Sequence, residues 1–501
     1  MLKDFSAMIY TTEQVRSGEA NAAAEHDVSM AQLMQRAAQA CLLAIKQQHP
    51  VGAQLLILCG PGNNGGDGWV LARLAQQAGY RVRVAGAKPS SQLAKEAAQA
   101  WHDHGGSSIV LTDVQSQHFE GVDIVVDALL GNGLARDLDA LYQRVVELLN
   151  HKARGCWVLS IDVPTGLDSD TGCPKPIAVH ANKTVTMIAM KVGLVTGQAA
   201  NFCGAIELAD LGVAGAFYRA KPALRAISHN VVRECLPTRA AASHKGMFGH
   251  VLIVGGGPGM SGAVNLAGRA ALRCGAGKVS VATHGSSQLA VAVSQPELMV
   301  HHVNDDLSRL LTLASVVVIG PGLGQTEWAQ KLVEQVGCWE GPVVWDADAL
   351  NIFAQQPIRK PEGATWYFTP HPGEAARLLQ SSAKHVESDR MQALTQLCQN
   401  FHAHVLLKGS GTLIQNYGSD MRWVCRRGSP ALATGGSGDV LSGVVGAMIA
   451  QHVDAENVLP VSVWLHAVAG ENAAQNGERG TLASDLLMQL RALVNPTQQP
   501  G

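Results

Sequence analysis

A segment with three closely spaced glycines and one aspartate, ATGGSGDVLSG at residues 433–443, carries the most specific chemistry of the chain. Gly435, Gly436 and Gly438 bring backbone amides to the start of a helix expected over Asp439–Ala450, and such a nest stabilises charge on a transferring phosphoryl group. A carboxylate beside phosphate is repulsive unless it accepts the proton of the attacking hydroxyl. The alternative, an acid favoured by the helix dipole at about 0.3–1 kcal/mol, leaves the glycines unexplained. The pattern therefore favours Asp439 as a proton acceptor.

Further polar residues stand at the ends of apolar strand-like runs in the second half. VLLKGSGTLI, residues 405–414, places Lys408, Ser410 and Thr412 where a nucleotide could bind. Three other loops, IGPGLG, VWDADALN and TPHPGEAARLL, supply Gly322, Gly324, Asp346, Asp348, Asn351, His371 and Glu374. The position of His371 in a Pro-Gly loop at a strand end favours a functional role over a structural one. Asp346 and Glu374 could support magnesium or cap helices.

Three loops of the first half follow apolar runs and carry oxygen-bearing side chains. They are GPGNNGGDG at residues 60–68, DALLGNGL at 127–134 and SIDVPTGLDSDTG at 160–172. In open α/β sheets ligands gather at the carboxyl ends of strands, so we expect these loops to converge. Asn64, Asp127 and Thr165 offer oxygens suited to a hard cation, which leaves Asp162 as a candidate acid–base group. The alternative is that these residues only cap turns and helices.

Two of the glycine loops also fit the GxGxxG dinucleotide pattern, one at Gly60, Gly62 and Gly65 and one at Gly257, Gly259 and Gly262. A dehydrogenase of this type needs an acid at the end of the following strand to hold the ribose hydroxyls. The following runs, RVRVAGAK and KVSVATH, end instead on Lys88 and His284. The sequence therefore disfavours hydride transfer in both halves.

Short runs of β-branched residues alternate along the chain with longer helical patterns, and these elements must position the loops. Such alternation is typical of βαβ units in a mainly parallel sheet with helices on both faces. The first series of expected strands is Gln54–Gly60, Arg81–Gly86, Val122–Ala128, Trp157–Asp162 and Thr184–Ala189, with helices over Gly66–Ala78 and Asp137–Asn150. The second series is Val251–Gly255, Lys278–Thr283, Ser315–Gly320, Pro342–Asp346, Trp366–Thr369 and Val405–Lys408. Ala214–Ala242 shows no clear strand, so we expect two α/β domains, 1–225 and 226–501.

Composition narrows the class of protein. The chain has 501 residues, 47% hydrophobic and 16% charged, which indicates more than one compact core and no disordered chain. A net charge of −2 gives no field that would attract nucleic acid or an anionic membrane. The ten cysteines form no C-x-x-C pair, and no leader or membrane-spanning run is evident. We therefore expect a soluble cytoplasmic protein that binds neither nucleic acid nor membrane.

The loops of the first half resemble the N-terminal domain of the NAD(P)H-hydrate repair family, an epimerase of hydrated nicotinamide cofactors. The resemblance covers roughly residues 10–215 and rests on GNNGGDG and DVPTGLD. It implies a Rossmann-like three-layer sandwich, potassium held by Asn64, Asp127 and Thr165, and catalysis by Asp162, which also contacts substrate, and by Lys191 of MKVGL. The family more often has Ser at Thr165, where the hydroxyl is kept, and Thr at Asn132. The further residues implied around the hydrate are Asn63, Asn64, Gly65, Gly66, Asp67, Gly131, Asn132, Gly133, Leu134, Ala135, Arg136 and Asp137.

The second half is similar to the C-terminal domain of the same family, a ribokinase-like dehydratase that uses ADP. This resemblance covers roughly residues 230–492, from HKGMFGHVLIVGG to GTLASDLL, with Met247-Phe248 departing from the commoner acidic-aromatic pair. It implies that Asp439 is the base and that Ala263, Gly324 and His371 contact the hydrate together with it. The residues implied around ADP and its magnesium are Lys408, Gly409, Ser410, Gly411, Thr412 and Gly438.

The two resemblances imply a bifunctional repair enzyme. The first half would interconvert the R and S epimers of hydrated NADH and NADPH (NADHX and NADPHX), and the second would dehydrate the S form with ADP to give reduced cofactor, AMP and phosphate. The expected partners are these small molecules, in a homo-oligomeric protein. The alternative is a ribokinase-like kinase of a small alcohol with a cofactor-binding N-terminal module, but such a module has no need of Asp162 and Lys191.

Overall fold

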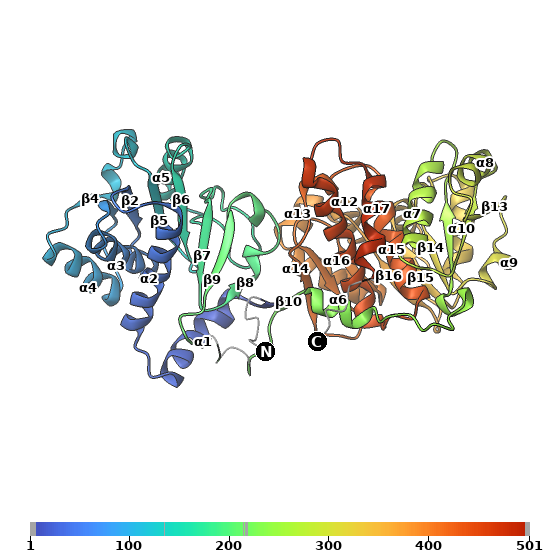
Figure 1. The fold of residues 1–501 in the computed structure, drawn as a ribbon, viewed down its shortest axis with the longest axis horizontal. Helices are drawn as coiled ribbons and strands as arrows, with labels where there is room; N and C mark the ends of the chain where they lie inside the picture. Colours follow the sequence, from blue (N-terminus) through green and yellow to red (C-terminus); the bar gives the residue numbers. More distant parts are fainter. Residues whose placement is uncertain (1–6, 135, 214, 216–218, 496–501) are drawn as a thin grey trace. The chain divides into compact units, whose positions relative to one another are not determined.

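The computed structural model describes residues 7–134, 136–213, 215 and 219–495. The chain divides into two compact units, Met1–Arg225 and Ala226–Gly501 (Figure 1). Each unit is an α/β structure built on a mainly parallel sheet, so the predicted fold class is confirmed. Within the described residues, no helix is both long enough and apolar enough to cross a bilayer.

The sheet of the first unit is parallel throughout and has the order β4-β3-β2-β5-β6-β7-β9. Its strands are β2 (Gln54–Cys59), β3 (Arg81–Gly86), β4 (Ser108–Val110), β5 (Ile124–Ala128), β6 (Trp157–Ile161), β7 (Lys183–Met187) and β9 (Ala205–Ala209). The chain moves outward from β2 to β4 and then returns to the other side of β2 with β5. The strand order therefore reverses between β2 and β5, and ligands bind at such a switch point in open α/β sheets.

Helices cover both faces of this sheet, namely α1 (Thr12–Glu25), α2 (Met30–Gln48), α3 (Asn63–Gln77), α4 (Gln92–Asp103) and α5 (Ala140–Lys152). Successive side chains of a strand point to opposite faces, so the continuous apolar run of β2 supplies two cores. Leu55 and Ile57 belong to the cluster that contains the α2 and α3 side chains, whereas Leu56 and Leu58 belong to the α5 cluster. Each such side chain contributes about 1.5–3 kcal/mol when fully buried.

Three very short strands form a ribbon outside the seven-stranded sheet of the first unit. β1 (Met8–Tyr10) runs parallel to β8 (Met190–Lys191), with Tyr10 opposite Lys191, and antiparallel to β10 (Leu224–Ala226). The expectation that Ala214–Ala242 contains no strand is therefore wrong. The three residues of β10 have no alternating pattern long enough to read, and they pair with a partner more than two hundred residues away in the chain.

The sheet of the second unit has the order β13-β12-β11-β14-β15-β16-β17-β18-β19, parallel as far as β17 and antiparallel thereafter. Its strands are β11 (His250–Gly255), β12 (Lys278–Thr283), β13 (Met299–His302), β14 (Val316–Ile319), β15 (Pro342–Trp345), β16 (Thr365–Phe368), β17 (His404–Leu407), β18 (Thr412–Gln415) and β19 (Arg422–Cys425). The strand order again reverses between β11 and β14, and the glycine loops after these two strands meet there: Gly257 N donates to the carbonyl of Gly322 at 2.7 Å.

Twelve helices accompany the described part of this sheet. They are α6 (His229–Cys235), α7 (Ser261–Arg273), α8 (Gly285–Ser294), α9 (Ser308–Leu311), α10 (Glu327–Gly337), α11 (Ala347–Gln355), α12 (Pro372–Leu378), α13 (Ala383–Ser388), α14 (Arg390–Phe401), α15 (Ser437–Ala450), α16 (Ala455–Ala473) and α17 (Ala483–Leu493). α15 is buried nearly all round and packs against α7, α16 and the sheet. Gly443 allows the close approach to α7, because a Cβ there would lie 2.0 Å from the carbonyl oxygen of Ala267.

Candidate active sites

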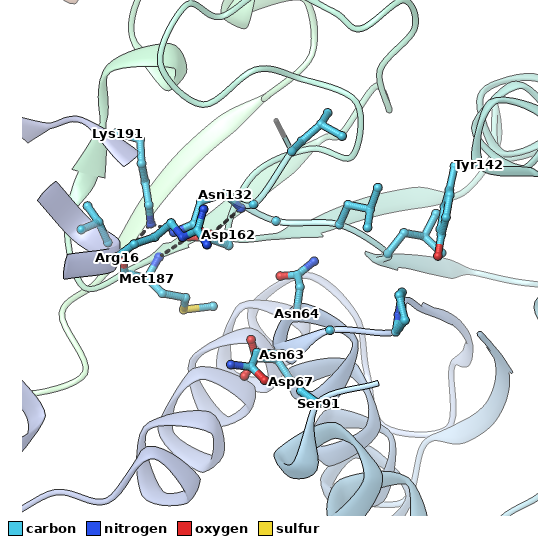
Figure 2. A pocket seen from close by; sticks show the side chains of 18 of the residues that line it. Arg16, Asn63, Asn64, Asp67, Ser91, Asn132, Tyr142, Asp162, Met187 and Lys191 are labelled. Atoms are coloured by element: carbon cyan, nitrogen blue, oxygen red, sulfur yellow. Dashed lines mark hydrogen bonds and ion pairs between the residues drawn. The ribbon is translucent and has the colours of Figure 1, made fainter. Parts of the chain in front are cut away.

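A cavity of about 900 Å³ opens at the β2/β5 switch point of the first unit (Figure 2). Its floor is the N-terminus of α3, whose Asn63, Asn64 and Asp67 face Asp162 and Asn132 across the cavity. The predicted residues that line it are Asn63, Asn64, Asp67, Gly131, Asn132, Gly133, Leu134, Arg136, Asp137, Asp162 and Lys191. The three loops singled out in the sequence thus come together around one space. Ala135 lies outside the described residues.

Asp162 and Lys191 form an ion pair in the wall of this cavity. The Lys191 ammonium is fully buried and also donates to Thr186 Oγ1 at 3.0 Å and to the Met187 carbonyl at 2.7 Å. The second oxygen of Asp162 accepts from the backbone N–H of Asn132 at 3.2 Å. A buried ammonium is tolerated only when it is paired and hydrogen-bonded, so this network fixes both side chains in one geometry.

The backbone at Asp162 is in an unfavourable region. Its φ of +68° is in the left-handed region, where a non-glycine residue is strained by on the order of 1–3 kcal/mol. Ile188, which also lines the cavity, has the same φ of +68°. Two such residues beside one cavity are typical of a site whose geometry the surrounding fold imposes.

The N-terminus of α3 provides free backbone amides. The helix begins at Asn63, and its N-cap residue, Gly62, makes no side-chain capping hydrogen bond. Uncapped N–H groups and the helix dipole together favour an anion such as a pyrophosphate. Gly65 and Gly66 do not line the cavity: a Cβ on Gly65 would lie 1.9 Å from the Gly60 carbonyl oxygen, and one on Gly66 would lie 2.5 Å from Met34. These two glycines therefore serve the packing of the loop.

The residues predicted to hold potassium lie in two groups. Asp127 is fully buried, and its carboxylate accepts hydrogen bonds from Thr165 Oγ1 (2.6 Å), Thr165 N (2.8 Å), Ser160 Oγ (2.9 Å) and Leu129 N (3.3 Å). Burial raises the pKa of Asp127, and these hydrogen bonds oppose the rise. The hydroxyl of Thr165 also lies 3.0 Å from the Leu130 carbonyl oxygen. The Asn64 side chain faces the Gly131 and Asp162 side of the cavity instead, and its buried Nδ2 has no hydrogen-bond partner among the described residues.

In the second unit, Asp346 and Lys408 form the centre of a buried polar cluster. The Lys408 ammonium lies 2.5 Å from Asp346 Oδ1, which also accepts from the Thr369 hydroxyl at 2.7 Å. Ser442 of α15 donates to the other oxygen of Asp346. A Cβ on Gly438 would lie 3.4 Å from the Lys408 ammonium, so this cation stands directly beside the glycine loop. Lys408 is therefore placed where a phosphate bound at the loop would meet it.

Asp439 lies in the first turn of α15, behind an N-cap glycine, Gly436, with φ of +89°. The pKa of Asp439 is raised to about 7, because burial and the negative charges of Asp346 and Asp348 raise it more than the positive charge of Lys408 lowers it. A carboxyl group with a pKa near the working pH can accept a proton without being permanently neutralised. The structure thus gives this aspartate the property that general-base chemistry requires.

The other predicted contacts of the second unit surround this cluster. Ala263 lies in the first turn of α7, and a Cβ added to Gly322 would lie 2.9 Å from the Cβ of Ala263. Gly324 N donates to Asp348 Oδ2 at 2.8 Å. His371 caps α12, because its Nδ1 accepts from Gly373 N at 2.9 Å, and its Nε2 lies 3.3 Å from a Glu374 oxygen. Burial and the nearby charges of Lys408 and Arg377 lower the pKa of His371, and Asp346 opposes the fall.

The predicted nucleotide segment, Lys408–Thr412, is the turn between β17 and β18. Arg390 holds this turn, since its guanidinium donates to the carbonyls of Leu407 (3.2 Å) and Lys408 (3.1 Å). Gly409 has φ of +137°, and a Cβ there would lie 2.7 Å from the same guanidinium. Ser410 is exposed, and Thr412 Oγ1 donates to the Gly409 carbonyl at 3.1 Å. The turn is therefore rigid at its base and open at Ser410.

Comparison with known proteins extends over both units. Residues 251–491 match the family model described as NAD(P)H-hydrate dehydratase, and residues 30–193 match the YjeF-related protein N-terminus. The bifunctional NAD(P)H-hydrate repair enzyme of Coxiella burnetii is 43% identical to this chain, and the match covers 98% of this chain and 100% of that protein. It belongs to the bifunctional NAD(P)H-hydrate repair enzyme family. The counterpart in Escherichia coli is 37% identical over 97% of this chain and 94% of that protein.

Solved structures match the dehydratase unit of this repair enzyme. The ADP/ATP-dependent NAD(P)H-hydrate dehydratase of Bacillus subtilis, crystallised with ATP and Mg²⁺, is 30% identical and covers 54% of this chain and 97% of its own, with a TM-score of 0.50. A ribokinase-like superfamily protein of Enterococcus faecalis is 26% identical and covers 56% of this chain and 98% of its own, with a TM-score of 0.50. The predicted ribokinase-like fold of the second unit is confirmed.

Several residues of the repair enzyme's two sites received no role in the sequence analysis, and four of them bear on the argument. Arg16 and Glu19 of α1 line the first cavity, and Arg390 and Ser442 hold the polar cluster and turn of the second unit. Ser442 follows Asp439 by three residues in GDVLSG, so helical spacing could have placed both on one face. No comparable signal points to Arg16, Glu19 or Arg390, because tertiary packing brings them to their sites.

Proposed function

We propose that residues 1–225 interconvert the R and S epimers of NADHX and NADPHX, and that residues 226–501 dehydrate the S epimer with ADP. The products of the second reaction are reduced cofactor, AMP and phosphate. The observation that carries this proposal is the presence, in one chain, of two glycine-loop sites that each contain a buried lysine–aspartate pair, Lys191–Asp162 and Lys408–Asp346. A single kinase site would need only the second of these. Hydration yields both epimers, so an epimerase joined to a dehydratase specific for one of them lets all damaged cofactor be repaired.

In the dehydratase unit, Asp439 accepts the proton of the cofactor hydroxyl as that oxygen attacks the terminal phosphoryl group of ADP. Lys408 and the amides around Gly438 stabilise the charge on the transferring group. Elimination of phosphate from the resulting ester then restores the ring double bond. The burial of Asp439 and its pKa of about 7 support this assignment.

Magnesium bound with the nucleotide would neutralise charge on the transferring phosphoryl group. Asp346 and Glu374 are the carboxylates that would support it, since both lie close to Lys408 beside the glycine loop. Burial raises the pKa of Glu374, and Lys408 opposes the rise. A cation beside Glu374 would favour its charged form.

Potassium in the epimerase unit would draw the loops after β2, β5 and β6 together and offset the repulsion between Asp127 and a pyrophosphate. The donor set fits a hard cation, since the Thr165 hydroxyl lies within hydrogen-bond distance of both the Asp127 carboxylate and the Leu130 carbonyl. The amide oxygen of Asn64, which faces Gly131 on the loop after β5, would be a further ligand. We therefore keep Asn64, Asp127 and Thr165 as the proposed ligands.

The direct test uses a mixture of R and S NADPHX with and without ADP, and nuclear magnetic resonance to follow both epimers and the phosphorus products. We expect interconversion alone without ADP, and consumption of both epimers with ADP, yielding one AMP and one phosphate per NADPH. A stable phosphorylated alcohol as the end product would instead show a kinase and contradict the proposal.

A further inference from the structure

Glu19 is a carboxylic acid in the wall of the epimerase cavity that none of the glycine loops supplies. It lies on α1, and Val15 and Arg16 of the same helix also line the cavity. Residues three and four apart share one face of a helix, so this face of α1 closes the cavity. Among the described residues, the Glu19 carboxyl makes no hydrogen bond and no ion pair. It is therefore free to meet a bound molecule.

The fold holds this helix face beside the Asp162–Lys191 pair. β1 pairs with β8 so that Tyr10 lies opposite Lys191, and α1 begins two residues later at Thr12. Thr12 N donates to Asp170 Oδ1 at 2.7 Å, and the hydroxyls of Thr12 and Ser169 lie 2.7 Å apart. Asp170 and Ser169 belong to the loop that starts at Asp162. The start of α1 is thus fixed both to the strand of Lys191 and to the loop of Asp162.

Charged groups face Glu19 from several elements. Burial raises the pKa of Glu19, the charge of Asp162 raises it further, and Lys191 opposes the rise. Asp67 of α3 also lines this cavity, and burial, Asp162 and Glu19 raise its pKa. Arg16 stands one turn before Glu19 on α1. Glu19 therefore holds a proton more readily than an exposed glutamate, in the same cavity as the Asp162–Lys191 pair.

We propose that Glu19 is a second acid–base residue of the epimerisation, with the nicotinamide ring bound between Glu19 of α1 and Asp162 of the loop after β6, which line the same cavity. This inference rests on the proposed epimerase function. Hydration of the nicotinamide enamine places the hydroxyl on the carbon bonded to the ring nitrogen. Inverting that carbon by departure and return of the oxygen requires an acid on one face and a base on the other.

The step balances as follows in one direction. Protonated Glu19 gives its proton to the hydroxyl, the C–O bond breaks, the oxygen leaves as water, and the nitrogen lone pair forms a C=N bond. A water molecule then adds to the opposite face, the C=N electrons return to nitrogen, and the proton that this water loses passes to the Asp162 carboxylate. One water leaves and one enters, and the two carboxyl groups exchange roles in the reverse direction.

The variant Glu19→Gln keeps the size of the side chain and removes its proton transfer. We expect epimerisation of each pure epimer to fall by about 10²–10⁴-fold, while ADP-dependent turnover of the S epimer is unchanged. Glu13→Gln is the matched control, because Glu13 is an exposed acid of the same helix. Epimerisation by Glu19→Gln at the control rate would overturn the inference. Absence of epimerisation in the wild-type protein would instead contradict the proposed function itself.

Isotopic oxygen tests the step independently of the mutation. In H₂¹⁸O we expect the wild-type protein to introduce one ¹⁸O per inversion, above uncatalysed exchange, and Glu19→Gln to lose inversion and labelling together. Inversion with the original oxygen retained would overturn the step. Should the glutamine variant be insoluble, Glu19→Ala serves instead: epimerisation by this variant at the rate of the Glu13→Gln control would equally overturn the role.

Discussion

Replacing Asp439 by asparagine should abolish the base of the dehydratase and at the same time stabilise the second unit at alkaline pH. The pKa of Asp439 is raised from 3.8 to about 7, chiefly by burial. At 1.36 kcal/mol per pKa unit this shift corresponds to on the order of 4 kcal/mol of destabilisation by the charged form. The cost is absent below the unfolded pKa and complete above the folded one, because the folded state binds the proton more tightly. The variant Asp439→Asn removes this cost, because asparagine carries no charge.

Two assays check this prediction. Turnover of the S epimer with ADP should fall by about 10²–10⁴-fold, and the loss of wild-type kcat/KM below about pH 7 should disappear from the residual activity. Denaturant unfolding should show the variant more stable than wild type at pH 8.5, by up to about 4 kcal/mol, and equally stable near pH 4. Glu327→Gln is the control, since Glu327 is a first-turn acid with an 83% exposed side chain. Near-wild-type turnover by Asp439→Asn would show that Asp439 is not the base. Equal stability of the variant and the wild type at pH 8.5 would show that the charge of Asp439 does not destabilise the folded state.

Three further predictions concern other residues. Lys191→Met leaves Asp162 buried without its cation. We expect epimerisation to fall by about 10²-fold or more, the free energy of denaturant unfolding of the first unit to fall by about 3–5 kcal/mol, and dehydration to stay unchanged. Epimerisation at the wild-type rate would contradict a role for this pair. Gly443→Ala places a Cβ 2.0 Å from the Ala267 carbonyl oxygen, and it should lower the free energy of unfolding, followed by thermal denaturation, by about 1–3 kcal/mol. Gly155→Ala is the control: a Cβ there has no atom within 4 Å, so it should leave that free energy almost unchanged. Rubidium soaked into crystals should give an anomalous peak beside Asp127, and a peak elsewhere would make Asp127 only a turn cap.

Inner strands such as β2, β5, β11 and β14 could be predicted from the sequence because they are buried on both faces and read as short apolar runs. Leu55–Leu58 illustrates this, since alternate residues enter two different cores. The outer strands β4, β9, β13 and β19 were not predicted, since they are partly exposed and carry no such run. The ribbon of β1, β8 and β10 could not be predicted, because strands of two or three residues depend on partners far away in the chain.

Helix boundaries were predicted less well, for local reasons. The expected start at Gly66 is wrong, since α3 begins at Asn63: packing against Gly60 and Met34 overrides the low helix propensity of the glycines. The expected start at Asp137 is also wrong, because the N-cap of α5 is Asp139, which accepts from Leu141 N at 3.0 Å. Both errors amount to about three residues.

The polar loops of the two sites were apparent in the sequence because glycines and acids directly follow apolar strands. Glu19 was not, since its place beside Lys191 depends on the pairing of β1 with β8. Arg390 likewise reaches the Lys408 turn only through the packing of α14 on β17. Residues that act from a neighbouring helix carry no signal in one sequence.

The central claim is that two separate sites divide the labour of repair, and it can be tested with one variant. Asp162→Asn and wild-type protein are each given an equal mixture of R and S NADPHX with excess ADP, and NADPH is followed by absorbance. Wild type should convert the whole mixture, whereas the variant should stop rapidly at the S half and finish only at the spontaneous rate of epimer exchange. Complete and rapid conversion by the variant would contradict the account.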